Sequence, residues 1–260
     1  MNRLNSNHER KEEEKLYEEL YEKLKIMKFS GMAEELRKQG QNAESTTMNF
    51  EERFIELVNA EWNLRYNKKF QRYLKKSDLK IPVASFDEKL YDPDSGLNTT
   101  LIEWPNTCEW IETGQNLLIT GMTGTGKSFY ANALGIAALK QFKTVRYIKA
   151  SKLLTELDSY RQLDDKVKIL NLVEQLSKVD LLIIDDFGLM ELDIEKCRDL
   201  FEILDGREGR KSTIVISQLP VKEWYDLFKD STYADACLDR LLYKSYRLEF
   251  KGDSLRKNDK

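Results

Sequence analysis

Residues 121–128 read Gly121-Met122-Thr123-Gly124-Thr125-Gly126-Lys127-Ser128, and this stretch decides the fold. An apolar run over 117–119 precedes it, and a helical pattern over 129–140 follows it. Glycines at this spacing let backbone amides wrap around phosphate oxygens, the start of a helix favours negative charge, and a lysine reaches the β and γ oxygens. The pattern therefore predicts a phosphate-binding loop (P-loop) for ATP, as opposed to a chance glycine turn. Its expected ATP contacts are Gly121, Thr123, Gly124, Thr125, Gly126, Lys127, Ser128 and Phe129.

Two carboxylates, Asp185 and Asp186, end the apolar run over 181–184. Acids at this end of a strand lie where open α/β sheets bind their ligands, and here they have the form of a Walker B segment. We expect Ser128 and Asp185 to bind Mg²⁺. Lys127 and Asp186 are the expected catalytic residues of this region, and Asp186 would orient or deprotonate the attacking water. The alternative for Asp186 is a helix-capping or turn residue. Because aspartate is one methylene shorter than glutamate, slow or partner-dependent ATP hydrolysis is expected.

Short apolar runs alternate with helical stretches after Gly114, and they cover 116–120, 144–148, 181–184 and 213–216. Such runs fit buried parallel strands covered by helices on both faces. The predicted fold class is therefore α/β, a P-loop core with a parallel sheet between helices. Gln218 follows the last run and is expected to contact the γ-phosphate or the water in catalysis. Ser217-Gln218-Leu219-Pro220 is also compatible with an ordinary loop.

The first part of the chain has a different pattern. Leucines at helical spacing predict an amphipathic helix over 9–28, and a second pattern predicts one long helix over 50–74. The turn signal Asp92-Pro93-Asp94-Ser95-Gly96 follows these helices. We therefore predict a small all-α N-terminal domain over 1–80 for DNA or oligomer contacts, a linker over 81–98 and an ATPase domain over 99–260.

Composition excludes several classes of protein. The chain has 260 residues and a net charge of −3, so its overall charge gives no reason to expect nucleic acid. No apolar run approaches the roughly 18 residues of a membrane span, and no apolar targeting segment is present, so we expect a cytoplasmic protein without membrane contacts. Cys108, Cys197 and Cys237 are far apart and are expected to be reduced, and His8 is the single histidine.

A local basic pattern departs from that average. Residues 62–80 contain seven basic residues and one acid, Asp78. On a helix the basic residues form a stripe that can follow a phosphate backbone, although a solvated charged face is the alternative. The expected DNA contacts are Arg65, Lys68, Lys69, Arg72 and Lys76. The neighbouring row of Trp62, Tyr66, Phe70 and Tyr73 is interpreted as core packing and not as a base-stacking platform.

With these residues in place, the chain resembles AAA+ ATPases of the helicase-loader and initiator group, and within that group the IstB-like ATP-binding helpers of insertion-sequence transposases. The resemblance covers nearly the whole chain. It rests on residues 24–33, 50–53, 61–65, 185–188, 217–220, 234–241 and 251–257.

The resemblance implies several roles. Arg240 falls in the segment that offers an arginine finger to a neighbouring subunit in catalysis, and Arg256 falls where a second sensor arginine would contact ATP. The alternative for each is an exposed surface charge. Arg207 and Arg210 are left open as further trans contacts. The helical stretch over 151–162 is similar to the insertion that marks initiators and loaders. The implied partners are double-stranded DNA without sequence preference, a cognate transposase and further copies of the chain.

Three alternatives to a transposition helper stay open. A replicative helicase loader of the DnaC type has the same ATPase core, but its N-terminal domain binds a helicase. A small-molecule kinase uses the same P-loop scaffold, although the two-acid strand end and the Arg240 segment are unfavourable to it. A scaffold that binds nucleotide without hydrolysing it is the third.

Overall fold

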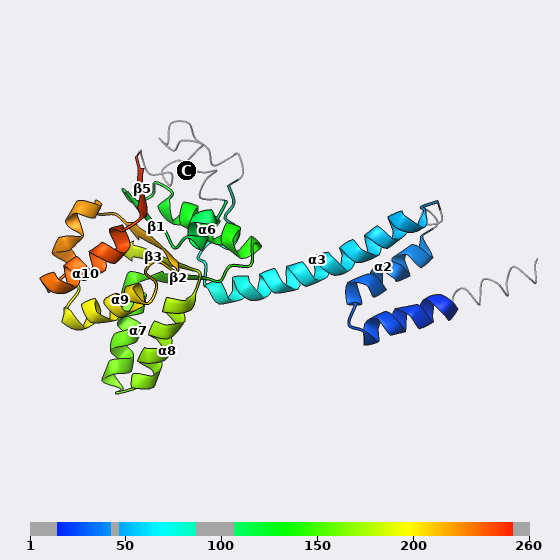
Figure 1. The fold of residues 1–260 in the computed structure, drawn as a ribbon, viewed down its shortest axis with the longest axis horizontal. Helices are drawn as coiled ribbons and strands as arrows, with labels where there is room; N and C mark the ends of the chain where they lie inside the picture. Colours follow the sequence, from blue (N-terminus) through cyan, green and yellow to red (C-terminus); the bar gives the residue numbers. More distant parts are fainter. Residues whose placement is uncertain (1–14, 43–46, 87–106, 252–260) are drawn as a thin grey trace, which may run out of the picture. The chain divides into compact units, whose positions relative to one another are not determined.

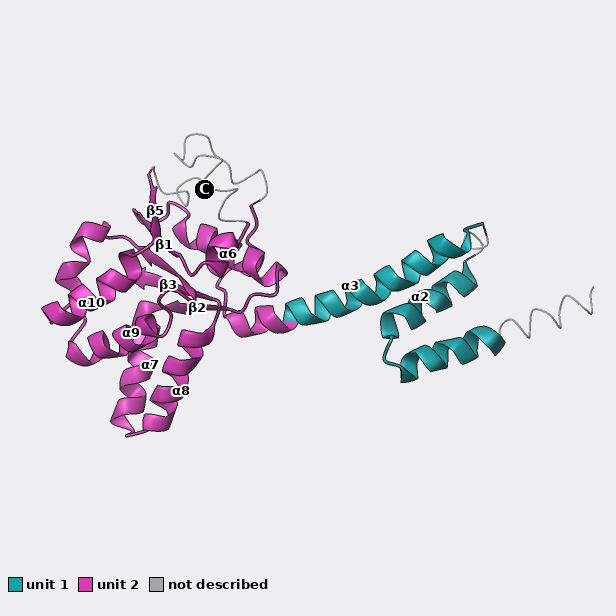
Figure 2. Cartoon of the chain, viewed as in Figure 1, with its two compact units in different colours: residues 1–71 teal, residues 72–260 magenta. Residues whose placement is uncertain are grey.

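The computed structural model describes residues 15–42, 47–86 and 107–251, and the chain divides into two compact units, Met1–Gln71 and Arg72–Lys260 (Figure 2). We call these the N-terminal unit and the C-terminal unit. His8, Arg256 and residues 87–98 of the predicted linker lie outside the described ranges.

Helices make up the described part of the N-terminal unit. They are residues 15–26, α2 (Ser30–Gln41) and most of α3 (Phe50–Ser77), whose last turns belong to the C-terminal unit (Figure 1). A reciprocal pair of hydrogen bonds starts α3. The Asn49 side chain accepts from the Glu52 amide, and the Glu52 carboxylate accepts from the Asn49 amide, both at 2.9 Å. This capping box explains why the long helix begins where it does.

Glu61 joins α2 to α3. Its carboxylate accepts hydrogen bonds from the amides of Gly31 at 2.6 Å and Met32 at 3.3 Å, in the first turn of α2, and it pairs with Arg65 at 2.5 Å. Burial on its own would raise the pKa of Glu61, but the bonds from Arg65, Gly31 and Met32 together hold that pKa below its usual value. Since Phe29 at the N-cap makes no side-chain bond, the carboxylate of α3 caps α2.

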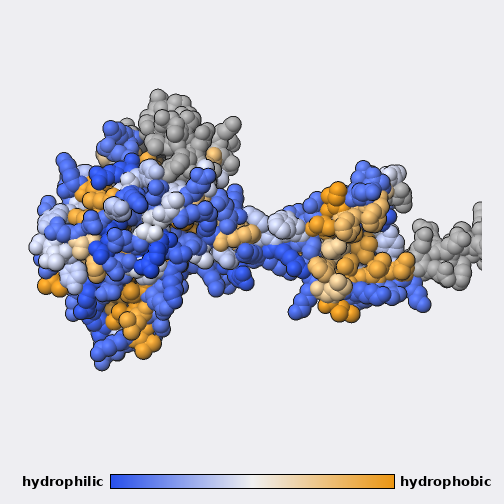
Figure 3. All heavy atoms as spheres, in the orientation of Figure 1, coloured by the Kyte–Doolittle hydropathy of each residue, from blue (hydrophilic) through white to orange (hydrophobic). Residues whose placement is uncertain are grey.

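The aromatic row of α3 is more exposed than the sequence predicted. Trp62 is 67% exposed, so its assignment to the core is wrong, and the other three rings of the row are only partly covered. The physical reason is that α3 is long and α2 is short and polar, so α2 covers only one stripe of α3. Apolar side chains are visible on the surface of this unit (Figure 3). Further exposed apolar residues of α3 are Phe50, Phe54, Ile55 and Val58.

In the described part of the C-terminal unit, five parallel strands form one sheet in the order β2-β3-β4-β1-β5 (Figure 1). The predicted α/β class with a parallel sheet is confirmed, and each predicted strand is present. The strands are β1 (Asn116–Gly121), β2 (Val145–Lys149), β3 (Leu181–Phe187), β4 (Ser212–Ser217) and β5 (Ser245–Phe250).

The strand β5 was not predicted from the sequence. Only Leu248 and Phe250 of this strand are buried, whereas Tyr246, Arg247 and Glu249 are exposed. An edge strand with one covered face lacks the continuous apolar run that marks the central strands.

Helices cover both faces of the sheet. Leu118, Leu182 and Val215 point to a core shared with α7 to α10, whereas Ile183 on the other face lies next to Gly135 of α6. None of the helices in the described ranges has the length and apolar composition that a bilayer crossing requires. The helices of this unit are α5 (Glu109–Glu112), α6 (Lys127–Lys140), α7 (Ala150–Gln162), α8 (Lys166–Lys178), α9 (Ile194–Asp205) and α10 (Ser231–Leu242), with 3₁₀ turns η4 (Val221–Glu223) and η5 (Tyr225–Leu227).

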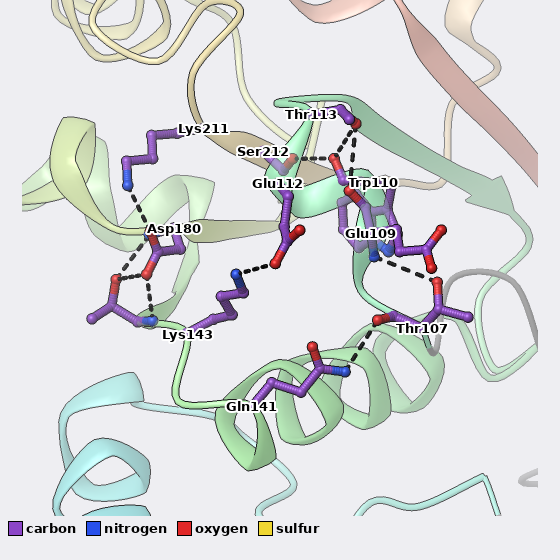
Figure 4. Close-up of polar contacts among 11 residues, drawn as sticks. Thr107, Glu109, Trp110, Glu112, Thr113, Gln141, Lys143, Asp180, Lys211 and Ser212 are labelled. Carbon is purple, nitrogen blue, oxygen red and sulfur yellow. Dashed lines mark hydrogen bonds and ion pairs between the residues drawn. The ribbon is translucent and has the colours of Figure 1, made fainter.

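Polar side chains tie together the amino ends of three strands, at the sheet edge opposite the P-loop (Figure 4). Asp180, just before β3, accepts two bonds of 2.7 Å from the backbone and hydroxyl of Thr144, just before β2, and pairs at 2.6 Å with Lys211, just before β4. Burial on its own would raise the pKa of Asp180, but Lys211 and Thr144 hold it below its usual value. These bonds fix the strand starts, and with them the positions of the strand ends.

The three cysteines are buried thiols that form no disulfide bond. Burial raises the pKa of Cys108 to about 11 and that of Cys237 to about 12, and it also raises that of Cys197. Protonated, buried thiols are poor nucleophiles, so these residues act as small apolar side chains.

Substituting Gly31 tests the contact between α2 and α3. A Cβ atom at Gly31 would lie 2.6 Å from the carbonyl oxygen of Ala60, whereas at Gly40 the nearest atom would be a Tyr17 ring carbon at 3.4 Å. We expect Gly31→Ala to destabilise the helix pair by about 1–3 kcal/mol, more than the roughly 0.5–1 kcal/mol that alanine gains in a helix. Hydrogen exchange of the α3 amides in the full chain measures this. Gly40→Ala is the control, and equal protection in both variants would contradict the packing role of Gly31.

Candidate nucleotide-binding site

The predicted P-loop lies between β1 and α6. After β1 the chain turns through Gly124 at φ 88° and Gly126 at φ 92°, which are conformations that other residues rarely adopt. The helix α6 starts at Lys127, and Gly126 at its N-cap has no side chain to bond the first amides. These amides and the helix N-terminus favour an anion. The loop therefore has the backbone geometry of a phosphate cradle.

Lys127 is buried beneath this loop and only 7% exposed. Its Nζ donates to the carbonyl oxygens of Gly121 at 2.6 Å and Met122 at 2.7 Å. The Thr125 hydroxyl also donates to the Met122 carbonyl, at 2.9 Å. The Lys127 ammonium and the Thr125 hydroxyl thus stabilise the turn of the loop. The ammonium lies beside the backbone that would surround a phosphate.

Gly121 has a reason to be glycine that does not involve a ligand. It pairs with Phe250 of β5, and a Cβ atom at Gly121 would lie 2.3 Å from the Phe250 carbonyl oxygen. No side chain fits into that space, so the neighbouring strand requires the first glycine of the motif. Its assignment as an ATP contact stays a prediction.

Asp185, near the end of β3, accepts several hydrogen bonds. Its carboxylate accepts from the Ser128 hydroxyl at 2.9 Å, from the Tyr147 hydroxyl at 2.5 Å and from the Asp186 amide at 2.8 Å. Burial and the Asp185 carboxylate raise the pKa of Tyr147, so its hydroxyl keeps its proton and donates. Asp185 is 2% exposed and is therefore fixed in place. The structure brings together the two residues predicted to bind Mg²⁺.

Asp186 lies beside Asp185 in an unusual backbone conformation. Its φ is +58°, and the pairing of β3 with β4 shifts register between Ile184 and Phe187. Its carboxylate pairs with Nζ of Lys149, the last residue of β2, at 2.6 Å. The second acid of the motif thus points to the neighbouring strand and does not cap a helix.

Gln218 is placed next to the P-loop by the end of β4. Its side-chain oxygen accepts a hydrogen bond of 2.7 Å from the Thr123 hydroxyl. The sequence separates these residues by 95 positions, so the sheet order is what joins them. Phe129, also predicted to contact ATP, is half-buried in the first turn of α6.

Arg240 lies away from the P-loop of its own chain. Its backbone carbonyl accepts from Asn116, the first residue of β1, whereas the P-loop follows the last. At about 3.3 Å per residue, the two ends of β1 are roughly 16 Å apart. The guanidinium pairs with Asp205 at 2.6 Å and Glu208 at 3.4 Å, and it lies over the Phe201 ring. Arg240 therefore does not belong to its own phosphate site.

Arg207 is a structural residue that the sequence analysis did not recognise. It is 1% exposed and lies in the turn after α9, where it donates to the carbonyl oxygens of Leu176 at 2.5 Å and Val179 at 2.9 Å, to the Ser212 carbonyl, and to the Thr213 hydroxyl at 3.0 Å. Burial lowers its pKa to about 9, which still leaves it charged at neutral pH. Arg207 is consequently not available for a trans contact, whereas Arg210 in the same turn is exposed.

The residues predicted to bind DNA are all exposed on α3. Arg65 is not free for that role alone, because it pairs with Glu61 and donates to the Lys28 carbonyl at 3.1 Å. Arg72 lies over the Tyr73 ring, and the Lys76 carbonyl accepts from Arg146 of β2 at 3.4 Å. The remaining members of the predicted set are Lys68 and Lys69.

A family model described as IstB-like ATP binding protein matches residues 22–260. The chain belongs to this family. A Sinorhizobium fredii relative, y4pL, named as an insertion sequence ATP-binding protein, is 36% identical over 92% of this chain and 96% of its own length. An ATP-binding protein of insertion sequence IS21 from Pseudomonas aeruginosa is 27% identical over 94% of this chain and 89% of its own. The resemblance on which the sequence analysis relied is confirmed.

Solved structures show the same fold. The DnaC helicase loader aligns with a TM-score of 0.50 at 20% identity, over 69% of this chain and 99% of its own. DnaA from Aquifex aeolicus, bound to AMPPCP, aligns at 0.54 and 19% identity, over 68% of this chain and 52% of its own. This IstB-like chain is thus an ATP-binding protein with the AAA+ fold.

The donor set at the end of β3 fits Mg²⁺. In the described ranges, no group of three or more acidic, histidine or cysteine side chains gathers to hold a metal by itself. Magnesium in nucleotide sites takes one or two protein ligands together with phosphate oxygens and water. The Ser128 hydroxyl and the Asp185 carboxylate, 2.9 Å apart, match that requirement.

Tyr147 and Lys149 were missed by the sequence analysis. Both lie on β2, which the apolar pattern identifies but whose polar residues it leaves unassigned. The available signal was their period of two: residues 147 and 149 share a face of the strand, and the sheet order places that strand next to β3. The order of strands in a sheet is not readable from a single sequence, so the acids of β3 could not be predicted as the neighbours of Tyr147 and Lys149.

Replacing Arg207 tests its structural role. Arg207→Met removes the charged donor to the carbonyl oxygens of Leu176, Val179 and Ser212, and the loss of each such bond costs about 1–3 kcal/mol. We expect the unfolding free energy of the C-terminal unit to fall by at least about 3 kcal/mol in denaturant titrations. Arg210→Met, which alters an exposed charge in the same turn, should change it by no more than about 0.5 kcal/mol. Similar stability of the two variants would show that Arg207 does not hold the turn.

Proposed function

We propose that this IstB-like protein is an ATP-dependent transposition helper. ATP bound between neighbouring copies drives oligomerisation on double-stranded DNA, and the assembly selects or remodels target DNA and recruits its partner transposase. The observation that carries the proposal is the position of Arg240, at the sheet edge opposite its own P-loop, in a chain whose relatives are named as ATP-binding proteins of insertion sequences.

Each residue of the site has one part in hydrolysis. ATP supplies the phosphoanhydride bond that is broken, and Mg²⁺ neutralises phosphate charge. The loop amides and Lys127 bind the phosphates, and Ser128 with Asp185 holds the ion. Asp186 orients or deprotonates the attacking water, and Gln218 contacts the γ-phosphate or that water. The short side chain of Asp186 supports a slow reaction that depends on assembly.

Arg240 completes the site of a neighbouring copy. A guanidinium donated in trans stabilises charge on the transferred phosphoryl group, an effect worth roughly 10³–10⁵ in the rate of GTPases. Arg240 is held by Asp205 and Glu208, which keep the guanidinium ordered in the single chain. Arg256 is proposed as a second arginine that contacts ATP. A site that needs two chains makes hydrolysis conditional on assembly.

The basic row of α3 supports binding to duplex DNA without sequence preference. Arg65, Lys68, Lys69, Arg72 and Lys76 are exposed along one helix. Such a row neutralises successive phosphates and releases counterions, so the affinity falls as salt rises. We propose the helical domain over 1–80 as the part that contacts DNA and other copies, with 81–98 as the linker to the ATPase domain.

A replicative helicase loader is the second candidate, favoured by the shared fold with DnaC. The family match, which begins at residue 22 and so includes most of the N-terminal unit, supports transposition instead. Capture of the cognate transposase, and not of the replicative helicase, on the immobilised protein would distinguish the two.

Lys127→Ala tests the whole proposal. Because the lysine lies beneath the loop, we expect the variant to lose nucleotide binding by at least tenfold and to form no oligomers on DNA. Electron microscopy with ATP and a short duplex measures assembly, and phosphate release measures hydrolysis. Lys140→Ala, in the last turn of the same helix, is the control. Oligomers of Lys127→Ala that match the wild type would overturn the site assignment, and no phosphate release by the wild type would indicate a non-hydrolysing scaffold.

Reversing two charges of the basic row tests DNA binding. Lys69→Glu combined with Arg72→Glu should weaken binding to all duplexes alike, and should reduce the slope of log affinity against log salt by about two. Fluorescence anisotropy over a salt series on two unrelated sequences measures both quantities. Lys166→Glu with Lys222→Glu makes the same change of charge elsewhere and should leave the slope as it is. A loss restricted to one sequence would contradict backbone tracking.

A further inference from the structure

A tyrosine in the middle of β2 binds the carboxylate that is predicted to hold Mg²⁺. The Tyr147 hydroxyl donates to Oδ2 of Asp185 at 2.5 Å, and the Ser128 hydroxyl donates to the same oxygen at 2.9 Å. A phenol carries its proton at neutral pH, so it acts as a donor toward a carboxylate. Tyr147 thus reaches the predicted metal site without being one of its predicted ligands.

The sheet explains why this position carries a tyrosine. The register partner of Tyr147 in β3 is Ile183, two residues before Asp185, and Ile183 lies on the sheet face that α6 covers. Residues two apart on a strand share a face, so the phenol and the carboxylate both lie on that side. Two residues of a strand span roughly 6.6 Å. A tyrosine side chain bridges that distance, whereas a serine or threonine is too short.

Burial gives the bond its weight. Tyr147 is 6% exposed and Asp185 is 2% exposed, so water has little access to either group. Hydrogen bonds to a carboxylate are roughly twice as strong as those between neutral groups. The other carboxylate oxygen, Oδ1, accepts from the Asp186 amide at 2.8 Å. Donors on both oxygens fix the plane of the carboxylate.

Tyr147 differs from the two other donors named here. Ser128 is itself a predicted ligand of the ion, and the Asp186 amide belongs to the residue that follows the carboxylate in the chain. Tyr147 comes from the neighbouring strand, so its bond orients Asp185 against the rest of the sheet. Magnesium demands near-ideal octahedral geometry, and groups that orient a metal ligand are typically worth about 10- to 100-fold in metal affinity.

We propose that Tyr147 is a positioning residue that orients the Asp185 carboxylate for Mg²⁺ and so sets how strongly Mg²⁺ strengthens ATP binding. This inference rests on the proposed function, since it takes Ser128 and Asp185 as the residues that hold the ion. The hydroxyl acts through Asp185 alone. Its removal therefore changes the response of ATP binding to Mg²⁺ and leaves the affinity for ATP without the ion as it is.

Binding of ATP to the full chain, once with Mg²⁺ and once with EDTA, tests the proposal. The ratio of the two Kd values measures how much the ion strengthens binding, and by linkage it reports the affinity for Mg²⁺. We expect Tyr147→Phe, which keeps the ring and its packing, to lower this ratio by about tenfold or more with the Kd in EDTA unchanged. Isothermal titration calorimetry measures both constants, and thermal unfolding checks that the variant is folded.

Tyr160→Phe is the matched control. It removes a tyrosine hydroxyl that also donates to a carboxylate, that of Glu156 at 2.8 Å on α7, and it should leave the ratio as it is. Asp185→Asn should lower the ratio by itself. Adding Tyr147→Phe to Asp185→Asn should lower it by less than about twofold more, because the hydroxyl acts through the carboxylate.

Two failures are distinguishable. If Asp185→Asn lowers the ratio and Tyr147→Phe does not, or if the two effects multiply in full, the role of Tyr147 is overturned and the magnesium site stands. If neither variant lowers the ratio, the assignment of Asp185 to Mg²⁺ in the function proposed above fails, and this inference fails with it.

Discussion

The hydrogen bond between Ser128 and Asp185 joins the start of α6, which follows β1, to the end of β3, and the rest of the site is arranged around it. The strand order places β4 between β1 and β3, so the P-loop, Gln218, the two acids and Lys149 follow one another along the carboxyl edge of the sheet. Parallel pairing is what aligns these ends. The bonds of Asp180 at the opposite edge fix where β2, β3 and β4 start. Because each strand has a set length, these bonds also help to fix where the strands end, and so where the site residues lie.

The central strands and the P-loop were predictable because their signals are local: continuous apolar runs, glycine spacing and acids at a strand end. Residues that act through sheet order were not. Tyr147 and Lys149 gain their meaning only from the position of β2 beside β3, and β5 carries too few apolar residues to be recognised. The role of Arg207 stayed open for a related reason, because a buried arginine and an exposed one look alike in a sequence, and only its carbonyl partners distinguish them.

The segments of the N-terminal unit that carry the family likeness have a physical explanation that requires no ligand. Gly31 allows α2 to approach the backbone of α3, and Glu61 bonds the amides that this approach leaves at the start of α2. Arg65 then neutralises Glu61. Residues in these segments can therefore define a helix pair, and Arg65 contributes to structure whether or not it also contacts DNA.

Arg240 makes hydrolysis conditional on assembly in the function proposed here. It is bound by Asp205 and Glu208 at the far edge of its own sheet, so it reaches a phosphate only when another copy is adjacent. The proposed site of one chain therefore lacks a positive charge that only a neighbouring chain supplies.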